Sequence, residues 1–422
     1  MKVATRVGAR DGKELLLGCF RAALDAVDAR RAVVRQLARE RLEGDWRVIA
    51  IGKAAGSMTQ GALEGLGGRV RQALVVTCPG HVPPGLADFA GVSVLESSHP
   101  RPDARSIAAG EAVADFVATL AERAQVLVLV SGGASSLVEM PVAGIELEDL
   151  EELNDWALGS GRPIGQINRL RRRVSRLKGG GLAALLGSRR VLSLMVSDVP
   201  GDDPAVIGSG LLHRAREARQ EPGELPPRIR AILSRAGDSA ERSGGGRTEV
   251  PYRIVASIKD ARRAAGTSAA ARGLRVRSGR GAYSGDAARL GRRFAATLLA
   301  CAPRTFWAWG GESTVRLPAD PGRGGRNQHL ALSAALAIDG REDVWLLAAG
   351  TDGIDGGSED AGAVVDGGSC MRGRRAGLEP RECLARADSG RFLEASGDLL
   401  YTGPTLSNVG DLVLGLSPGG GE

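Results

Sequence analysis

The stretch that most constrains the fold is 126–141, with the sequence VLVLVSGGASSLVEMP. Its first five residues are Val or Leu with no polar residue between them, and the run ends at Ser131, Gly132 and Gly133. A short, unalternating apolar run that ends at glycine is typical of a strand buried on both faces, in the middle of a parallel sheet. Helices must then cover both faces of that sheet.

The loop after this strand has the composition of an anion-binding site. The Gly132-Gly133 step lets backbone N–H groups approach a ligand, and Ser131 and Ser135 add hydroxyl groups next to an expected helix start. Such N–H groups and the positive end of the helix dipole both attract phosphate or carboxylate. A tight turn that binds nothing fits the same residues, so both interpretations stay open.

Length and composition narrow the function classes. A chain of 422 residues is long enough for two or three domains, and 43% hydrophobic with 25% charged residues is typical of a globular protein in water. Aromatic residues make up only 3%, which disfavours base-stacking surfaces. The net charge of +7 comes from scattered arginines whose one dense cluster is at 169–173, so we expect anionic small molecules rather than nucleic acid as partners.

The cysteines and the apolar runs predict a cytoplasmic protein without a membrane segment. The five cysteines lie far apart and form no CxxC pair, which is typical of reduced thiols. No apolar run approaches the roughly 18 residues that a membrane span requires.

Apolar runs alternate with helical patterns through residues 1–240, which predicts a doubly wound, mostly parallel Rossmann-like sheet domain. Its strands are expected near 47–51, 72–77, 92–95, 126–130 and 191–196. Ligands of such sheets bind beyond the carboxyl ends of the strands. Lys53, the loop at 131–136 and Asp198 are therefore expected on the same rim.

A second, smaller α/β domain is expected at 250–404, after a linker rich in Gly and Ser at 235–247. The C-terminal tail at 405–422 is a candidate to pack back on the first domain. Strands of the second domain are expected near 252–257, 274–277, 305–309, 313–317 and 343–349. The active site is expected in the cleft between the two domains.

The second domain contains glycine-dense stretches with polar residues beside them. Arg326 follows Gly324-Gly325 at an expected helix start, and Asp352 follows an expected buried strand. Both places can be plain turns, but a helix start with a cation suits an anion, and a carboxylate after a strand suits Mg²⁺. A Walker A motif, a GxGxxG fingerprint and a histidine cluster are all absent from the sequence. These residues together favour a kinase-like enzyme that acts on a small anion.

Several motifs follow one another along nearly the whole chain. They are IGKAAGSM with Lys53, SHP at 98–100, SGGASSLVEMP, LKGG with Lys178, SDV with Asp198, GGEST, GGRNQ with Arg326, GTDGIDG with Asp352, and TGPT at 402–405. In this set and order, the chain resembles the glycerate 2-kinase family, the two-domain type with a C-terminal MOFRL domain. The resemblance implies transfer of the γ-phosphate of ATP to the 2-hydroxyl of D-glycerate, with Mg²⁺.

The residues and the resemblance together predict the site. The expected catalytic residues are Lys53, Arg326 and Asp198, and the expected Mg²⁺ ligands are Asp198 and Asp352. The expected substrate or phosphate ligands are Ser131, Gly132, Gly133, Ser135, Lys178, Gly324, Gly325, Asn327 and Gln328.

Departures from the family pattern leave the acceptor open. They fall at Ala134, Arg173, Leu211, His329, Ala387 and Gly390. The alternatives are the same phosphoryl transfer to a related small hydroxy acid, a hydroxypyruvate reductase, and a catalytically silent binder. The nucleotide, the position phosphorylated and the assembly, with a homodimer as one candidate, also stay open.

Overall fold

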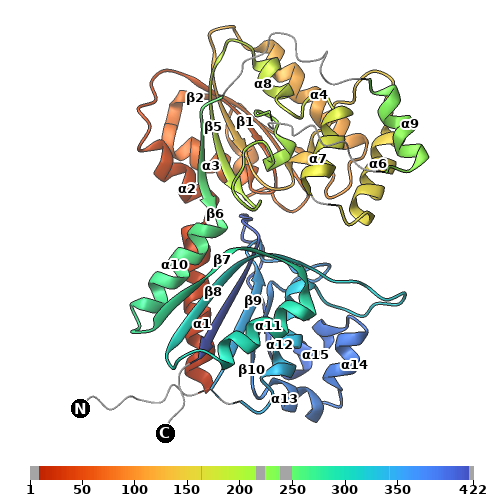
Figure 1. Cartoon of the computed structure of the whole chain (residues 1–422). Coiled ribbons are helices and arrows are strands. Elements are labelled where there is room, and N and C mark those ends of the chain that lie inside the picture. The colour runs from red at the N-terminus through yellow and green to blue at the C-terminus, as the bar shows by residue number, and fades with distance from the viewer. Residues whose placement is uncertain (1–8, 163, 215–223, 238–249, 342, 418–422) are drawn as a thin grey trace. The chain divides into compact units, whose positions relative to one another are not determined.

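The computed structural model describes residues 9–162, 164–214, 224–237, 250–341 and 343–417. It contains two six-stranded sheets with helices packed around each (Figure 1). The chain divides into two compact units, one of residues 29–255 and the other of residues 1–28 with 256–422. Each unit is built around one of the sheets, and the division falls inside the strand that ends the first sheet.

The first sheet has the strand order β3-β2-β1-β4-β5-β6. The strands are β1 (Trp46–Ile51), β2 (Val70–Thr77), β3 (Val92–Glu96), β4 (Gln125–Val130), β5 (Arg190–Ser197) and β6 (Tyr252–Ser257). β1 pairs in parallel with β2 and β4, β2 with β3, and β4 with β5. The order reverses between β1 and β4, and this is the switch point at which doubly wound sheets bind ligands.

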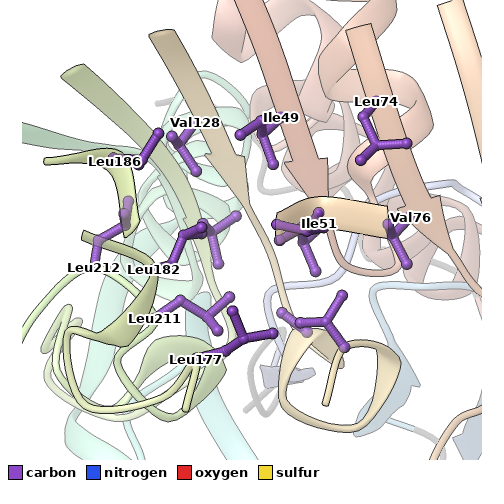
Figure 2. Packing of buried hydrophobic residues seen from close by; sticks show 14 of the residues in the cluster. Ile49, Ile51, Leu74, Val76, Val128, Leu177, Leu182, Leu186, Leu211 and Leu212 are labelled. Carbon is purple, nitrogen blue, oxygen red and sulfur yellow. The ribbon is translucent and has the colours of Figure 1, made fainter. Parts of the chain in front are cut away.

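Helices cover this sheet and build its core. They are α2 (Ala29–Leu37), α3 (Ala55–Leu66), α4 (Ala104–Thr119), α5 (Ala134–Leu137), α6 (Leu147–Gly159), α7 (Ile164–Arg173), α8 (Gly181–Leu186) and α9 (Pro227–Arg235). Figure 2 shows side chains of β1 and β4, such as Ile51 and Val128, in one cluster with Leu182 and Leu186 of α8. The predicted fold class is confirmed, because apolar runs buried on both faces can only be central strands.

The second sheet is mixed, with the order β11-β10-β9-β12-β8-β7. Its strands are β7 (Arg275–Asp286), β8 (Thr305–Thr314), β9 (Trp345–Gly350), β10 (Gly362–Asp366), β11 (Leu399–Leu400) and β12 (Asp411–Ser417). β7 and β8 are parallel, whereas β8/β12, β12/β9, β9/β10 and β10/β11 are antiparallel. This unit is therefore α/β, but its sheet is mostly antiparallel.

The helices of this unit lie on both faces of its sheet (Figure 1). α1 (Ala9–Ala26) and α10 (Ile258–Ala270) contact one face, and α11 (Ala287–Leu299) and α12 (Arg326–Ala337) contact the other. The remaining helices are α13 (Ser369–Arg375), α14 (Pro380–Ala385) and α15 (Ser389–Ser396). Among the helices of the described residues, none is long and apolar enough to cross a membrane.

The expected strands at 305–309 and 313–317 are one strand, β8. Gly310 and Gly311, which suggested a turn, lie inside it. A Cβ on Gly310 would lie 2.2 Å from Cγ1 of Ile258, and a Cβ on Gly311 would lie 2.2 Å from the Tyr283 carbonyl oxygen. These glycines allow α10 and β7 to approach β8 closely, so they mark a tight contact rather than a turn.

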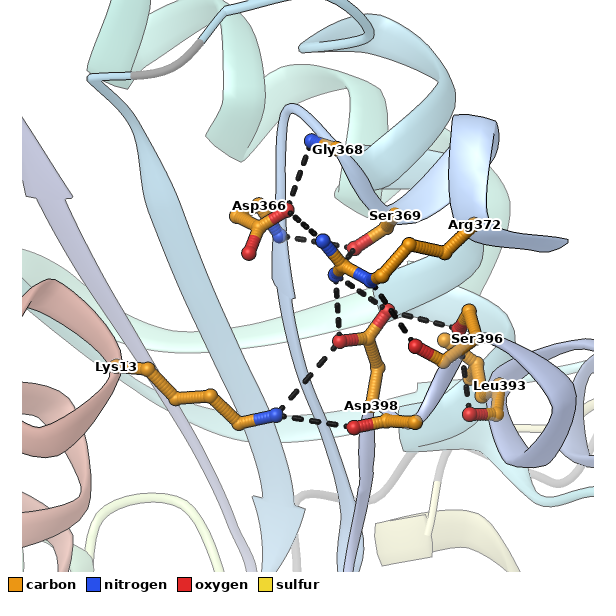
Figure 3. A network of polar contacts seen from close by, with 9 residues as sticks. Lys13, Asp366, Gly368, Ser369, Arg372, Leu393, Ser396 and Asp398 are labelled. Atoms are coloured by element: carbon orange, nitrogen blue, oxygen red, sulfur yellow. Dashed lines mark hydrogen bonds and ion pairs between the residues drawn. The ribbon is translucent and has the colours of Figure 1, made fainter. Parts of the chain in front are cut away.

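The unit boundaries differ from the expected 1–240 and 250–404, and α1 is the first difference. Although α1 begins the chain, it packs on the second sheet, where a Cβ on Gly12 would lie 2.5 Å from the Trp345 ring. Lys13 donates to the Gly397 carbonyl oxygen at 3.1 Å. Figure 3 shows Lys13 facing the Asp398 carboxylate, which lies 3.7 Å away. Asp398 is 1% exposed and also binds Arg372 through both carboxylate oxygens. This network holds α1 in the unit of the second sheet.

The tail is the second difference. Residues 411–417, which belong to the tail expected to pack on the first domain, form β12 between β8 and β9 in the second sheet. Its seven residues are all buried, which explains why a segment at the end of the sequence is central to the fold. Most of the expected linker, residues 238–247, lies outside the described residues.

Candidate active site

The turn after β1 and the loop after β4 are joined where the strand order reverses. The Lys53 backbone N–H donates to the Gly132 carbonyl oxygen at 2.9 Å, and the Ala54 N–H donates to Oγ of Ser131 at 3.0 Å. Gly52 has a φ of +132°, and a Cβ on it would lie 2.2 Å from that Oγ. Only glycine fits there, and it allows the two segments to meet.

Two glycines of the loop bring three side chains together. A Cβ on Gly133, which has a φ of +84°, would lie 2.9 Å from Cδ2 of His99 and 3.2 Å from Cγ of Lys53. A Cβ on Gly132 would lie 2.0 Å from Oδ2 of Asp198, the residue directly after β5. The structure thus places Lys53 and Asp198 at one loop, as expected from the carboxyl ends of parallel strands, and adds His99.

His99 is a neutral imidazole in a positive environment. Burial, and after it the positive charges of Lys53, His81 and Arg171, lower its pKa to about 4. A histidine with this pKa is uncharged at neutral pH and offers one ring N–H and one acceptor nitrogen. Its position against Gly133 makes His99 part of the candidate site.

The serines of the loop have hydrogen-bond partners within the protein. Ser131 is fully buried and its Oγ accepts the Ala54 N–H, and its expected role as a ligand stays a prediction. Ser135 Oγ lies 2.7 Å from Oγ of Ser209, which in turn donates to Oδ1 of Asn168 at 3.0 Å. The helix that follows, α5, is a single turn of four residues, so the helix dipole adds little to anion binding here.

Lys178, an expected phosphate ligand, has a buried ionic partner, and its ligand role stays a prediction. Its side chain is 2% exposed and forms an ion pair with Glu139, which is 3% exposed. Burial lowers the pKa of Lys178, and the charge and hydrogen bond of Glu139 oppose that effect. A buried cation whose partner is a buried carboxylate is costly to separate from it, so Lys178 stabilises the segment after α7.

In the other unit, Arg326 is the first residue of α12 and is held by carboxylates. Its Nε donates to Oδ2 of Asp411 at 2.6 Å and its Nη2 to Oδ1 at 2.9 Å, while Nη1 lies 3.2 Å from Oε1 of Glu312. Burial works to lower the pKa of Arg326, but the hydrogen bond and charge of Asp411 outweigh it and raise the pKa above its usual range. The side chain is 35% exposed, so part of the guanidinium still reaches solvent.

The expected anion site at the start of α12 is filled by the chain itself. Asp355 accepts the backbone N–H of Asn327 at 3.0 Å and that of Gln328 at 2.8 Å. A Cβ on Gly325 would lie 2.2 Å from Cγ of Asp355. Asn327 and Gln328 are fully buried, and the phosphate contacts expected of them and of Gly325 stay predictions. Gly324 is next to this contact and has a φ of +146°, so its backbone conformation explains the glycine.

The two expected metal ligands belong to different units. Asp198 lies against Gly132, and Asp352 accepts the Ile354 N–H at 3.2 Å, with its Oδ1 2.9 Å from a Cβ placed on Gly350. Within the described ranges, no group of three or more His, Cys, Asp or Glu residues is arranged to hold a metal ion. At the second place, Oδ1 of Asp411 also lies 3.7 Å from the Cβ placed on Gly350.

Sequence reasoning missed four residues that organise these sites: Glu139, Arg171, Asp355 and Asp411. Glu139 and Asp355 stand inside motifs that were quoted, but their partners are 39 and 27 residues away. Arg171 belongs to the dense arginine cluster at 169–173. Its position between Leu170 and Val174, which are both buried, places Arg171 on the inner face of α7. The helical spacing of these apolar residues is the sequence signal that could have identified it.

Family models match both parts of the chain. A model described as a domain of unknown function, DUF4147, matches residues 15–230, and the MOFRL family model matches residues 305–411.

Similar proteins cover nearly the whole chain. A D-glycerate 2-kinase of Thermotoga maritima is 34% identical over 96% of this chain and 98% of the relative. A protein of Agrobacterium vitis, provisionally named a hydroxypyruvate reductase, is 38% identical over 86% of this chain and 97% of the relative. The crystal structure of a glycerate kinase from Thermotoga maritima has a TM-score of 0.83 and 32% identity, covering 96% of this chain and 99% of that one.

Proposed function

The chain belongs to the glycerate 2-kinase family with a MOFRL domain, and on this premise we propose that it transfers the γ-phosphoryl group of ATP to the 2-hydroxyl of D-glycerate. The products would be ADP and 2-phosphoglycerate. The family makes the enzyme a phosphotransferase with an alcohol as acceptor, and the proposal adds the donor, the acceptor and the position.

One observation carries this proposal: Lys53, Asp198 and the glycines at 132 and 133 converge at the switch point of the first sheet. Phosphoryl transfer needs cations and backbone N–H groups around the phosphate oxygens. Gly132 and Gly133 let Asp198, His99 and Lys53 approach the loop backbone closely, because a side chain at either position would collide with them. The residues at this rim therefore match the charge distribution of the reaction.

Lys53 is proposed to contact the phosphoryl group as it moves. Its ammonium stands on the turn after β1, and its backbone N–H is held by Gly132, so the side chain starts from a fixed point. A positive charge near the developing charge is worth more in a site that excludes water. His99 can add a neutral hydrogen bond to the same group without repelling a cation.

Asp198 is proposed to hold Mg²⁺. The Asp198 carboxylate beside Gly132 suits this ion, which binds one or two protein carboxylates and completes its shell with water and phosphate oxygens. When bound, Mg²⁺ neutralises charge on the phosphate oxygens. Asp352 and Arg326 are proposed as the contributions of the other unit, and their roles stay predictions.

The experiment is an ADP-release assay over D-glycerate, L-glycerate, lactate, glycolate and tartronate, with and without Mg²⁺. We expect D-glycerate to give the highest kcat/KM, and the ³¹P signal of the product to couple to a single proton, the one on C2. Coupling to the two C3 protons would place the phosphate on the 3-hydroxyl instead. If ADP were released with the other acids but not with glycerate, the proposed acceptor would be wrong.

The name of the Agrobacterium vitis relative makes reduction of hydroxypyruvate the second candidate. The same preparation should therefore be tested for NADH and NADPH oxidation with hydroxypyruvate. The turn after β1 reads GKAAG rather than GxGxxG, so we expect no oxidation. A cytoplasmic location stays a prediction from the cysteine pattern.

A further inference from the structure

A small hollow of about 20 Å³ borders the loop after β4, within the unit of residues 29–255. Its polar lining consists of Ser135, Ser136, Glu139, Asn154, Arg171 and Lys178. A void of this volume holds about one water-sized group, so it admits one oxygen atom of a ligand and not a whole molecule. The rest of such a ligand would have to lie outside the hollow.

Arg171 supplies the uncompensated positive charge of this hollow. Lys178 and Glu139 form an ion pair and cancel each other. Arg171 donates from Nη2 to Oδ1 of Asn154 at 2.6 Å, and in the described part of the chain no carboxylate lies within ion-pair distance of its guanidinium. Burial lowers the pKa of Arg171 and Glu139 opposes this, but an arginine stays protonated in proteins. The positive charge is therefore permanent.

Asn154 adds a donor that lacks an acceptor. The side chain is 4% exposed, and its Nδ2 is buried without a hydrogen-bond partner among the described residues. A buried N–H without an acceptor costs free energy, so a bound oxygen atom would restore a lost interaction. Its Oδ1 already accepts from Arg171, so the two groups are fixed relative to each other.

The hollow is electrostatically connected to the candidate site. Ser135 belongs to the loop that carries Gly132 and Gly133, and Arg171 is one of the charges that lower the pKa of His99. A ligand oxygen in the hollow would therefore place the rest of a small molecule near the loop that Lys53 contacts.

We propose that Arg171 and Asn154 bind the carboxylate of the acid substrate and so select acids over neutral alcohols. This inference rests on the proposed function, and it assigns the specificity of the acceptor to two residues of α6 and α7. One carboxylate oxygen enters the hollow and accepts from Nδ2 of Asn154, while Arg171 balances the charge. A guanidinium with donors to spare suits a carboxylate better than an ammonium would.

The decisive variant is Asn154→Asp. It keeps an oxygen for Arg171 and strengthens that pair, but it removes the Nδ2 donor and places a negative charge where the substrate carboxylate would lie. We expect the KM for D-glycerate to rise about 10- to 100-fold, as for the loss of a hydrogen bond to a charged group. The KM for ATP should stay within about twofold, and turnover of the neutral amide glyceramide should not fall. A purely structural Asn154 predicts an unchanged KM for glycerate, and that result would overturn the inference.

Arg171→Lys is the second variant, used if Asn154→Asp does not fold, and it should raise the same KM by about tenfold. Arg173→Lys is the matched control on α7, because Arg173 donates to the Leu233 carbonyl oxygen instead. Calorimetric titration of each protein with glycerate, without nucleotide, separates this inference from the proposed function. Wild-type binding that Asn154→Asp abolishes supports the inference even if no phosphoryl transfer is found. Equal binding by wild type and Asn154→Asp overturns it even if the enzyme is a glycerate kinase.

Discussion

The two units carry candidate sites of opposite charge. At the switch point of the first sheet, burial and the cations Lys53, His81 and Arg171 lower the pKa of His99. At the start of α12 in the other unit, burial and, to a smaller extent, the charge of Asp411 raise the pKa of Asp355 to about 6. Burial and Asp411 also raise the pKa of Tyr283 well above its usual value. One set of residues favours anions and the other favours cations.

Similar glycine-rich stretches therefore occur in surroundings of opposite charge in the two units. In the loop after β4, glycines 132 and 133 lie against Asp198, His99 and Lys53, whose side chains come from three different loops. At the start of α12, Gly325 makes room for Asp355, which takes the helix N–H groups that a ligand would use. We therefore expect phosphate and carboxylate recognition to depend mainly on the first of these regions.

Lys53→Ala should have the largest effect on activity. The loss of a charged contact to the transferred group should lower kcat by about 10²- to 10³-fold, or about 3–4 kcal/mol of transition-state stabilisation. Steady-state ADP release measures it, with Lys259→Ala as the control because Lys259 is exposed on α10. Near-normal turnover of Lys53→Ala would show that the cations at the switch point of the first sheet do not act on the phosphoryl group.

Asp355 should give the next largest effect, on stability. Its folded pKa, about 6, is above the ordinary 3.8, so the folded state binds a proton more tightly than the unfolded state. Its contribution is therefore fully present below pH 3.8 and is lost as pH rises to about 6, by about 3 kcal/mol. Urea unfolding from pH 3.5 to 7 should show this slope in wild type and not in Asp355→Asn. Asp339→Asn, which removes an exposed carboxylate, is the matched control.

His99 should show the opposite pH dependence. Its folded pKa, about 4, is below the ordinary 6.5, so its contribution is present above pH 6.5 and is lost as pH falls through 4. We expect a loss of about 2 kcal/mol, because partial access to solvent weakens the effect of burial. His99→Asn should remove this slope in urea unfolding, and the ring proton signals of His99 should titrate near pH 4. Titration of those signals near pH 6.5 would remove the contrast between the two regions.

The strands of the first sheet could be predicted from the sequence better than those of the second sheet, and the reason is physical. Strands such as β4 are continuous apolar runs, because parallel strands are buried on both faces. In the second unit, β12 contains Gly415 and pairs with β8 and β9, which lie far before it in the sequence. The burial of β12 depends on β8 and β9 at its sides, which no local pattern in the tail reveals.

The same distinction applies to the candidate sites. Lys53 and Asp198 could be predicted because each follows a strand, and parallel strands end at one edge of the sheet. The ion pair of Lys178 and the capping of α12 by Asp355 could not, because each depends on a contact between segments more than 25 residues apart. Spacing in the sequence shows which groups are available, and only the fold shows which of them are already paired.

Arg326→Lys should have the smallest of these effects, and it tests the residues around the start of α12. Lysine keeps the charge but cannot bind both oxygens of Asp411, which is 1% exposed, so we expect unfolding free energy to fall by about 1–2 kcal/mol. If the guanidinium also contacts the transferred group, kcat should fall about tenfold, or about 1.4 kcal/mol, with the KM for ATP little changed. Arg323→Lys is the matched control, because Arg323 lies in the loop before α12 and forms an exposed ion pair with Glu394 of α15. Exposed ion pairs contribute about 0–1 kcal/mol to stability. An Arg326→Lys enzyme that unfolds more easily but turns over at the wild-type rate would show that Arg326 serves only to anchor Asp411. Catalysis would then depend on the residues at the switch point of the first sheet and not on Arg326.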